Sequence, residues 1–267
     1  MTAVMDAASE VVLGAPRADS FTAFGRRVEI WVADIGAAPG PDGLRAGELT
    51  SRAEAERAVR IGAPGGRVRH TAGRALARWA LASRLGCPPA EVPLVIGRNG
   101  RPELSVSDGD LWKYEQNPAD IDFNLSHAGD QVAVAVAHGL RVGIDIERVT
   151  GRPNVTGLAE RVFSAAERGL LAGAAPDGYL ARWYRIWTTR EAYVKAYGTG
   201  LSGIADALPD PGADWLAHEV RSAAPGYTAT AVACRDHRRT ESRTRSRAEG
   251  FTETAESSGE TGTATQS

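Results

Sequence analysis

The segment that most constrains this chain is Val-Gly-Ile-Asp-Ile-Glu at residues 142–147, whose apolar and non-apolar residues alternate strictly. Successive side chains of a β-strand point to opposite faces, so a strand here puts positions 142, 144 and 146 on an apolar face and both carboxylates on the other. Asp145 and Glu147 would then start about 7 Å apart. Carboxylates this close repel each other unless a cation lies between them or one is protonated. The pattern therefore indicates either a solvated acidic face or a site for a hard cation such as Mg²⁺ with a phosphate ligand.

The composition limits the classes of protein that this chain can represent. Its 267 residues, 43% of them hydrophobic, suit one large domain or two small ones. A net charge of −2 gives no general basic surface for nucleic acid or membrane lipid. Cys87 and Cys234 have neither disulfide nor zinc spacing, which predicts a reducing, cytoplasmic setting. No apolar run reaches the roughly 20 residues of a membrane span, and Asp6 and Glu10 argue against a signal peptide.

The first part of the chain has clear local signals. Residues 28–35 alternate as a strand does, and residues 51–60 form a helix in which Ser51 and Glu54 make a capping box. A longer helix over residues 68–85 ends at Gly86. A short strand at 92–96 leads into an Asn-Gly turn at 98–102. We predict a disordered leader at 1–26, an α+β half at 27–120 and a polar connector over 105–120.

The second α+β half is predicted over residues 121–234. Strands at 132–137 and 142–147 are expected to form a hairpin around Gly139. A short helix at 164–171 has a capping box of Ser164 and Glu167, a longer helix at 180–197 ends at Gly198, and a last strand covers 229–234. Residues 235–267 have the composition of a disordered tail.

Three short segments combine reactive side chains: Ser126-His127, Asp145-x-Glu147 and residues 187–195. In the last of these, Glu191 and Lys195 are one helical turn apart and share a face. Each segment alone also has an ordinary explanation. Glu191 can form a surface ion pair with Lys195 or a capping box with Thr188, and His127 can be a structural histidine.

Together, these segments resemble the motifs of the 4′-phosphopantetheinyl transferases, in particular the larger, surfactin-type class. The family motifs are Phe-Asn-(Leu/Ile)-Ser-His, Gly-(Ile/Val)-Asp-(Ile/Val)-Glu and Trp-x-x-Lys-Glu-x-x-x-Lys, which match residues 123–127, 143–147 and 187–195 in order and spacing. Residues 163–167 and 198–201 match the family's Phe-Ser-x-x-Glu and Gly-x-Gly-Leu. One departure is Arg190, where the family usually has Lys. Because Arg is a planar fork and Lys a point charge, the role of this position is left open.

The resemblance implies a fold and a reaction. The fold is α+β, with two similar halves related by pseudo-twofold symmetry, in a monomer that binds coenzyme A between them. The reaction transfers the 4′-phosphopantetheine arm of coenzyme A to a serine of an apo acyl or peptidyl carrier protein and releases 3′,5′-ADP. The larger class commonly serves polyketide and nonribosomal peptide synthesis. Neither nucleic acid nor a membrane is an expected partner.

The resemblance also assigns roles to individual residues. Asp145, Glu147 and Glu191 would bind Mg²⁺ or Mn²⁺, with Glu191 also the candidate base. Lys195 would contact the phosphate next to adenosine. The expected contacts of the other coenzyme A phosphates are Ser126, His127, Arg69, Arg101, Arg57 and Arg60. Solvated helix faces are an equally good explanation for Arg57 and Arg60.

Two other functions use the same residues. A metal-dependent phosphohydrolase would employ the three carboxylates with a nucleophilic water, although further Asp- or His-rich motifs are missing from the sequence. A coenzyme A-binding protein without transfer activity would not need all three carboxylates. Consumption of coenzyme A with and without a carrier protein separates these possibilities from the transferase.

Overall fold

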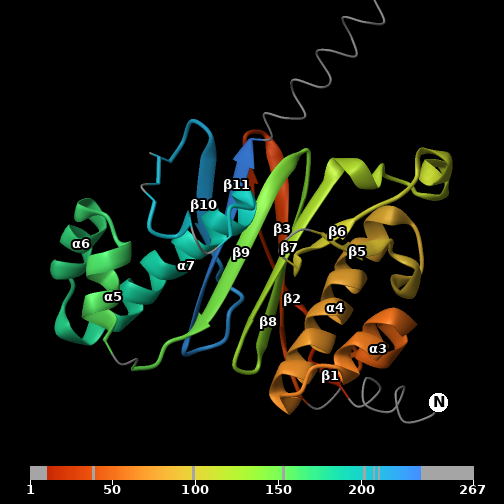
Figure 1. Ribbon diagram of the computed structural model, residues 1–267, viewed down its shortest axis with the longest axis horizontal. Helices are drawn as coiled ribbons and strands as arrows, with labels where there is room; N and C mark the ends of the chain where they lie inside the picture. The colour runs from red at the N-terminus through yellow and green to blue at the C-terminus, as the bar shows by residue number, and fades with distance from the viewer. Residues whose placement is uncertain are drawn as a thin grey trace, which may run out of the picture. The chain divides into compact units, whose positions relative to one another are not determined.

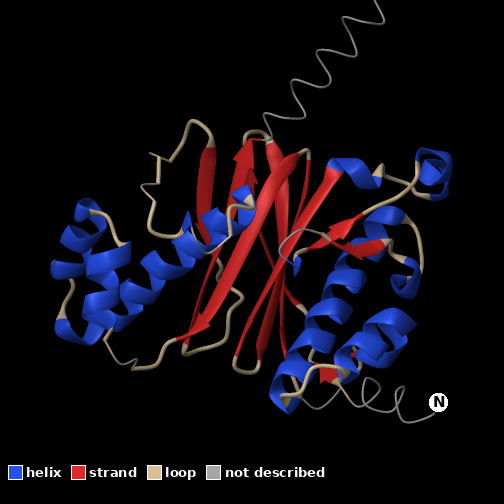
Figure 2. Cartoon of the chain, in the orientation of Figure 1, coloured by secondary structure: helices blue, strands red, loops and turns tan. Residues whose placement is uncertain are grey.

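The structure is a computed structural model that describes residues 11–235, except 38–39, 98–99, 152–153, 201–202, 207 and 210. Contacts divide the chain into Met1–Cys234 and Arg235–Ser267, and the sheets and helices below are those of the first unit. Helices and strands are mixed along the chain, which confirms the predicted α+β class (Figure 2). None of the helices in the described ranges is long and apolar enough to cross a membrane.

Two sheets form the centre of this unit (Figure 1). The first is antiparallel, with strand order β2-β3-β8-β7. Its strands are β2 (Arg17–Ala23), β3 (Arg26–Asp34), β8 (Gln131–His138) and β7 (Ile121–Ala128). The second has the order β10-β11-β9. Its strands are β10 (Trp215–Glu219), β11 (Tyr227–Arg235) and β9 (Leu140–Arg148).

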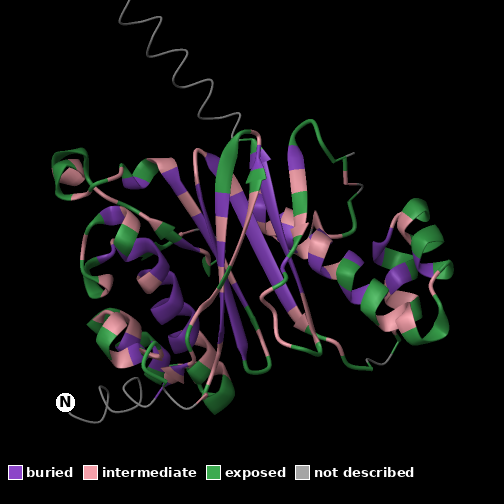
Figure 3. Ribbon diagram, turned by 180° about the vertical axis from the view of Figure 1, so that it is seen from behind, coloured by how far each residue is buried: buried purple, intermediate pink, exposed green. Residues whose placement is uncertain are grey.

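The two sheets share a core of small and β-branched side chains, and Figure 3 shows buried residues along their central strands. This core contains alternate residues of β3, β8, β9 and β11. They are Val28, Ile30, Val32, Ala133, Ala135, Ala137, Val142, Ile144, Ile146, Ala229, Ala231 and Ala233. Because β9 turns its apolar positions into this core, Asp145 and Glu147 lie on its opposite face, as the alternation predicted.

Helix α4 (Pro64–Leu85) covers the outer face of the first sheet and packs on Val132, Val134 and Val136 of β8 (Figure 1). The strand β8 is thus buried on both faces, which explains its uninterrupted apolar sequence. The helix begins four residues before the predicted start because Pro64 takes the first helical turn, where its fixed φ is compatible with a helix. It ends at Gly86, which has a φ of +66°.

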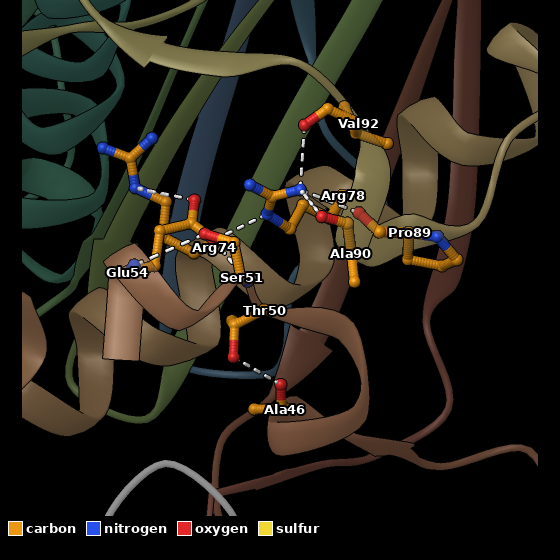
Figure 4. A network of polar contacts seen from close by, with 9 residues as sticks. All are labelled: Ala46, Thr50, Ser51, Glu54, Arg74, Arg78, Pro89, Ala90 and Val92. Atoms are coloured by element: carbon orange, nitrogen blue, oxygen red, sulfur yellow. Dashed lines mark hydrogen bonds and ion pairs between the residues drawn. The ribbon is translucent and has the colours of Figure 1, made fainter. Parts of the chain in front are cut away.

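A polar network fastens α3 (Arg52–Val59) to α4 (Figure 4). Ser51 and Glu54 form the predicted capping box, which is confirmed. Glu54 also accepts a hydrogen bond of 2.6 Å from Nε of Arg78, and Nε of Arg74 lies 3.9 Å away. Nη1 of Arg78 donates to the carbonyls of Pro89, Ala90 and Val92 around the 3-10 turn η1 (Pro89–Glu91). The short helix α2 (Ala46–Leu49) lies just before this network.

Three helices belong to the region after β9. They are α5 (Val155–Val162), α6 (Ala165–Ala172) and α7 (Tyr179–Tyr197). Ser164 and Glu167 form the predicted capping box of α6, and Gly198 ends α7 with a φ of +74°. The start of α7 packs with α5 and α6 around Trp183. The rest of α7 covers the outer face of the second sheet through Ala192 and Ala196.

The remaining elements are short. Strand β1 (Val12–Leu13) pairs with β4 (Leu44–Arg45), and β5 (Leu94–Ile96) pairs with β6 (Pro102–Leu104). The predicted turn at 98–102 lies between β5 and β6, although residues 98–99 are outside the described ranges. The predicted polar connector contains the 3-10 helices η3 (Asp108–Lys113) and η4 (Pro118–Asp120), and η5 (Pro176–Gly178) precedes α7.

Two predictions need correction. Residues 12–13 and 17–23 form β1 and β2, so the predicted disordered leader is wrong over that part. Pairing with β3 compensates for the weak local pattern of the edge strand β2. The predicted hairpin of β8 with β9 is also wrong, because β3 and β7 occupy both edges of β8 and β9 pairs with β11.

The predicted division of the chain into two halves does not follow the division into two sheets. Strands β2 and β3 come from the predicted first half, and β7 and β8 from the second, yet all four form one sheet. The boundary near residue 120 therefore does not separate the sheets. An internal duplication stays a prediction, as do the tails at 1–10 and 236–267, which lie outside the described residues.

Candidate active site

The site begins with the close contact between β9 and α7. An added Cβ at Gly143 would lie 2.0 Å from the carbonyl oxygen of Ala192 and 2.6 Å from the amide nitrogen of Ala196. Only glycine permits two backbones to approach this closely. The contact brings the outward face of β9, with Asp145, against the face of α7 that carries Glu191 and Lys195.

Asp145 is the centre of the polar cluster and is only 3% exposed. Its Oδ1 atom accepts hydrogen bonds from the Ser126 hydroxyl, at 2.9 Å, and from Nζ of Lys195, at 2.6 Å. Its Oδ2 atom is buried and has no hydrogen-bond partner among the described residues. A buried carboxylate oxygen without a donor is unfavourable, so Oδ2 marks a position that a ligand, water or cation can satisfy.

Glu191 adds a second carboxylate, and its Oε2 atom lies 3.5 Å from Nζ of Lys195. Burial and the negative charge of Asp145 raise the pKa of Glu191, with a smaller contribution from Glu147, although Lys195 opposes the shift. The structure thus brings the three predicted carboxylates within electrostatic range of one another.

The expected metal cluster itself is not formed. No group of three His, Cys, Asp or Glu side chains in the described ranges is arranged to hold a metal ion. The ammonium group of Lys195 instead lies against Oδ1 of Asp145. Hard carboxylate oxygens and the unpartnered Oδ2 atom nevertheless have the chemistry that Mg²⁺ requires. Metal binding stays a prediction.

The Ser126-His127 segment lies on β7, next to Asp145. The Ser126 hydroxyl donates to Asp145 and accepts hydrogen bonds from Lys195 Nζ at 3.2 Å and from the Ile146 amide at 3.3 Å. These three bonds use its full capacity, so contact with a phosphate requires one of them to be released. His127 is exposed. Although the residue is exposed overall, partial desolvation by its surroundings lowers the pKa of His127, against the opposing effect of a backbone hydrogen bond, and the positive charges of Arg69 and Lys195 lower it further.

The start of α4 forms a basic face that the sequence indicated only through Arg69. Three nearby positions have buried atoms without a hydrogen-bond partner among the described residues, namely Nε of Arg67, Nε2 of His70 and Oγ1 of Thr71. Burial lowers the pKa of His70, and the charges of Arg74, Arg57 and His127 also lower it against the opposing effect of Glu54. The signal that we missed is the i, i+3, i+4 spacing of these polar residues on one helix face.

The other predicted phosphate contacts have different surroundings. Arg57 on α3 and Arg60 just after it are exposed, and no described contact connects either side chain to Asp145 or Glu191. Arg101 is largely buried, and its Nη2 atom contacts both carboxylate oxygens of Asp122, at 3.0 and 3.1 Å. It also donates to the carbonyls of Phe123 at 2.9 Å, Val142 at 3.2 Å and Lys195. Arg101 therefore joins β7, β9 and α7, and a phosphate contact stays a prediction.

Arg190, where the chain departs from the family motif, is buried and contacts other parts of the protein rather than solvent. Its side chain is 1% exposed and forms a double contact with Glu167, with Nη2 2.5 Å from Oε2 and Nε 3.0 Å from each oxygen. Its Nη1 atom donates to the carbonyls of Ile204 and Asp206, at 2.7 and 3.0 Å. The side chain points away from solvent and holds α6 and residues 204–206 against α7. The planar fork of arginine suits these contacts, which lysine does not match.

The unit is α+β, and its two sheets share one core. A cluster of an aspartate, a glutamate and a lysine lies between β9 and α7. Comparison with known sequences identifies the family. The model of the family described as "4'-phosphopantetheinyl transferase superfamily" matches residues 141–245. The 4′-phosphopantetheinyl transferase AcpT of Escherichia coli O157:H7 is 35% identical over 167 residues, which cover 62% of this chain and 70% of that protein. The chain therefore belongs to the 4′-phosphopantetheinyl transferase superfamily.

Other relatives match shorter parts. AcpT of Salmonella typhimurium is 38% identical over 123 residues, or 46% of this chain and 57% of that protein. The 4′-phosphopantetheinyl transferase HetI of Nostoc sp. PCC 7120 is 33% identical over 153 residues, or 57% of this chain and 61% of that protein. The chain thus spans less than two thirds of the length of these two relatives. The surfactin-type subclass stays a prediction.

Proposed function

We propose that this protein transfers the 4′-phosphopantetheine arm of coenzyme A to a serine of an apo acyl or peptidyl carrier protein, with release of 3′,5′-ADP. The observation that carries the proposal is the cluster of Asp145, Glu191 and Lys195, in which one buried carboxylate oxygen has no partner in the described part of the chain. Family membership supports the same reaction.

The reaction places two demands on the protein. The carrier serine oxygen forms a bond to the pyrophosphate phosphorus nearest pantetheine, while the bond from that phosphorus to the bridging oxygen breaks. The serine proton must be accepted, and the charge that develops on the departing phosphate must be offset. Glu191 suits the first task because its raised pKa brings its proton affinity closer to that of a base working near neutral pH.

Lys195 suits the second task. Its side chain is 28% exposed, so it can reach a ligand while its ammonium group remains close to Asp145 and Glu191. Contact with the phosphate next to adenosine would place a positive charge where negative charge develops. Asp145, Glu147 and Glu191 would hold Mg²⁺ or Mn²⁺. The metal ion, when bound, supplies Lewis-acid stabilisation of the pyrophosphate oxygens.

The basic face of α4 suits the other phosphates of coenzyme A. Arg69 and His127 influence each other electrostatically, and unpartnered donor atoms lie next to them along the helix. We propose Arg69, His127 and Ser126 as contacts of this part of coenzyme A, with Arg101, Arg57 and Arg60 as further candidates. We also propose that the protein is a cytoplasmic monomer and modifies carriers of polyketide or nonribosomal peptide synthesis.

The decisive experiment is intact-mass spectrometry of an apo carrier protein incubated with this protein, coenzyme A and Mg²⁺. We expect the carrier to gain one phosphopantetheine group, only when metal is present. Asp145→Ala and Glu191→Ala should abolish the gain while the far-UV circular dichroism spectrum is retained. Glu160→Ala, which removes an exposed carboxylate on α5, is the matched control and should behave as the wild type.

The alternatives predict other results. Consumption of coenzyme A without any carrier would indicate a phosphohydrolase. Binding of coenzyme A without consumption, tested with fatty-acid, polyketide and peptide carriers, would indicate a binding protein. Near-normal transfer by Asp145→Ala or Glu191→Ala would refute the proposed site.

A further inference from the structure

Strands β7 and β9 belong to different sheets but lie side by side (Figure 1). A ladder of side-chain oxygens joins them. Three alternate residues of β7 accept hydrogen bonds from three alternate backbone amides of β9. The pairs are Asp122 Oδ2 with Val142 at 2.8 Å, Asn124 Oδ1 with Ile144 at 3.0 Å, and Ser126 Oγ with Ile146 at 3.3 Å. Each acceptor precedes its donor by 20 residues. This constant separation means that the strands run parallel in one register.

The ladder satisfies buried backbone groups that the sheets leave unpaired. Strand β9 is the last strand of its sheet after β11, so alternate amides on its other edge need another acceptor. Alternate residues of a strand share a face, and the polar face of β7 turns toward β9. Its apolar residues Phe123 and Leu125 pack instead in the core formed with α4. A carboxylate, an amide and a hydroxyl thus serve as equivalent acceptors.

The ladder reaches the candidate active site. Asp145 lies between the second and third amide donors, so these two contacts determine its position along β7. The third acceptor, Ser126, also donates to Asp145. The first acceptor, Asp122, binds Arg101, which in turn contacts the Lys195 carbonyl. The ends of the ladder therefore have additional partners within the site.

The middle acceptor differs from its two neighbours. Asn124 is 5% exposed, and the contact described for its side chain is the one with the Ile144 amide. It makes no described contact with Asp145, Glu191 or Lys195. A catalytic role would require such a contact, whereas a role in positioning requires only the bond to β9.

We propose that Asn124 is a positioning residue that maintains the register of β9 against β7 and thereby holds Asp145 between Ser126 and Lys195. A shift of one residue would turn Asp145 to the opposite face of β9. Smaller displacements also matter, because misplacing a reacting group by about 1 Å can reduce a rate on the order of 100-fold. The consequence for catalysis rests on the proposed transferase function, whereas the consequence for β9 does not.

The test compares two substitutions of similar volume. Asn124→Leu removes the acceptor, and Asn124→Asp keeps an oxygen in the same place, as Asp122 does one rung away. Hydrogen exchange of the Ile144 amide should become at least about tenfold faster in Asn124→Leu, as expected when a buried donor loses its partner. The value of kcat for carrier modification should fall on the order of 100-fold, with KM for coenzyme A nearly unchanged. Asn124→Asp should recover most of both losses.

Leu125→Ala is the matched control on the same strand. Leu125 faces Gly73 of α4 rather than β9, so its truncation should lower the melting temperature and leave kcat and the exchange of Ile144 unchanged. If Asn124→Leu does not fold, Asn124→Ala gives the same comparison. Wild-type exchange at Ile144 and wild-type kcat in the variant without an acceptor would overturn the proposal. If the wild type itself transfers nothing, the proposed function fails, and exchange at Ile144 still tests the register.

Discussion

The environment of Arg190 leads to a quantitative prediction about why arginine occupies this position. The guanidinium group is 1% exposed, and it contacts the Glu167 carboxylate and two backbone carbonyls. Arg190→Met removes the positive charge and leaves Glu167 without its cation. The loss of one partner from a buried ion pair costs about 3–5 kcal/mol. Arg190→Lys keeps the charge but cannot reproduce contacts in two directions, so we expect a smaller cost of about 1–3 kcal/mol.

Urea denaturation followed by circular dichroism measures these free energies. With a slope of about 2.5 kcal/mol per molar, a loss of about 4 kcal/mol lowers the midpoint by about 1.6 M. Arg185→Met is the matched control on the same helix. Arg185 lies 2.5 Å from Glu219, but their side chains are 59% and 54% exposed. An exposed pair of this kind contributes about 0–1 kcal/mol.

A double substitution separates the ion pair from the other contacts of Arg190. Glu167→Gln combined with Arg190→Met should destabilise the protein by less than the sum of the single variants, because each single variant leaves a charge unpaired. A midpoint for Arg190→Met equal to that of Arg185→Met would refute the buried structural role. Additive effects of the two substitutions would show that Glu167 is not the partner that matters.

Two further predictions concern packing and pH. Gly143→Ala should lower the free energy of unfolding by about 3 kcal/mol, because its Cβ would lie 2.0 Å from the backbone of Ala192. Gly109→Ala is the control and should have little effect, because no described atom lies within 4 Å of an added Cβ there. Similar melting temperatures for the two variants would contradict the close contact. Burial lowers the pKa of His70 below its ordinary value of about 6.5. Between these two values the unfolded chain binds more protons than the folded protein does. The free energy of unfolding must therefore fall as the pH falls through that range. His70→Gln should therefore lose less stability than the wild type between pH 7 and pH 5 in urea titrations, and equal losses would show that His70 does not contribute.

The features predicted correctly from the sequence depend on interactions between near neighbours in the chain. Both capping boxes join residues three positions apart. The helix ends at Gly86 and Gly198 depend on one residue with a positive φ. The alternation at 142–147 correctly separated an apolar from an acidic face. Matching the ordered motifs to a family correctly identified the superfamily. The roles that this match assigns to individual residues stay predictions.

The features that the sequence did not reveal depend on distant partners. Strand β2 has a weak pattern of its own and exists as the edge partner of β3, and β9 leaves β8 because both edges of β8 are occupied. Arg101 was expected to contact a phosphate of coenzyme A, yet it also binds a carbonyl 94 positions later. The role of Arg190 was left open by the sequence, and its carboxylate partner lies 23 positions earlier.

By itself, the sequence determined the α+β class, the ends of the main helices and the acidic face of β9, because each depends on backbone preferences or periodicity within a few residues. The tertiary structure alone decided that Lys195 contacts Asp145, that Asp145 Oδ2 lacks a partner, and that side chains of β7 hold β9 in register. These contacts arise when two sheets and α7 exclude water together. Burial then determines which polar atoms must find partners, and a linear pattern does not contain that information.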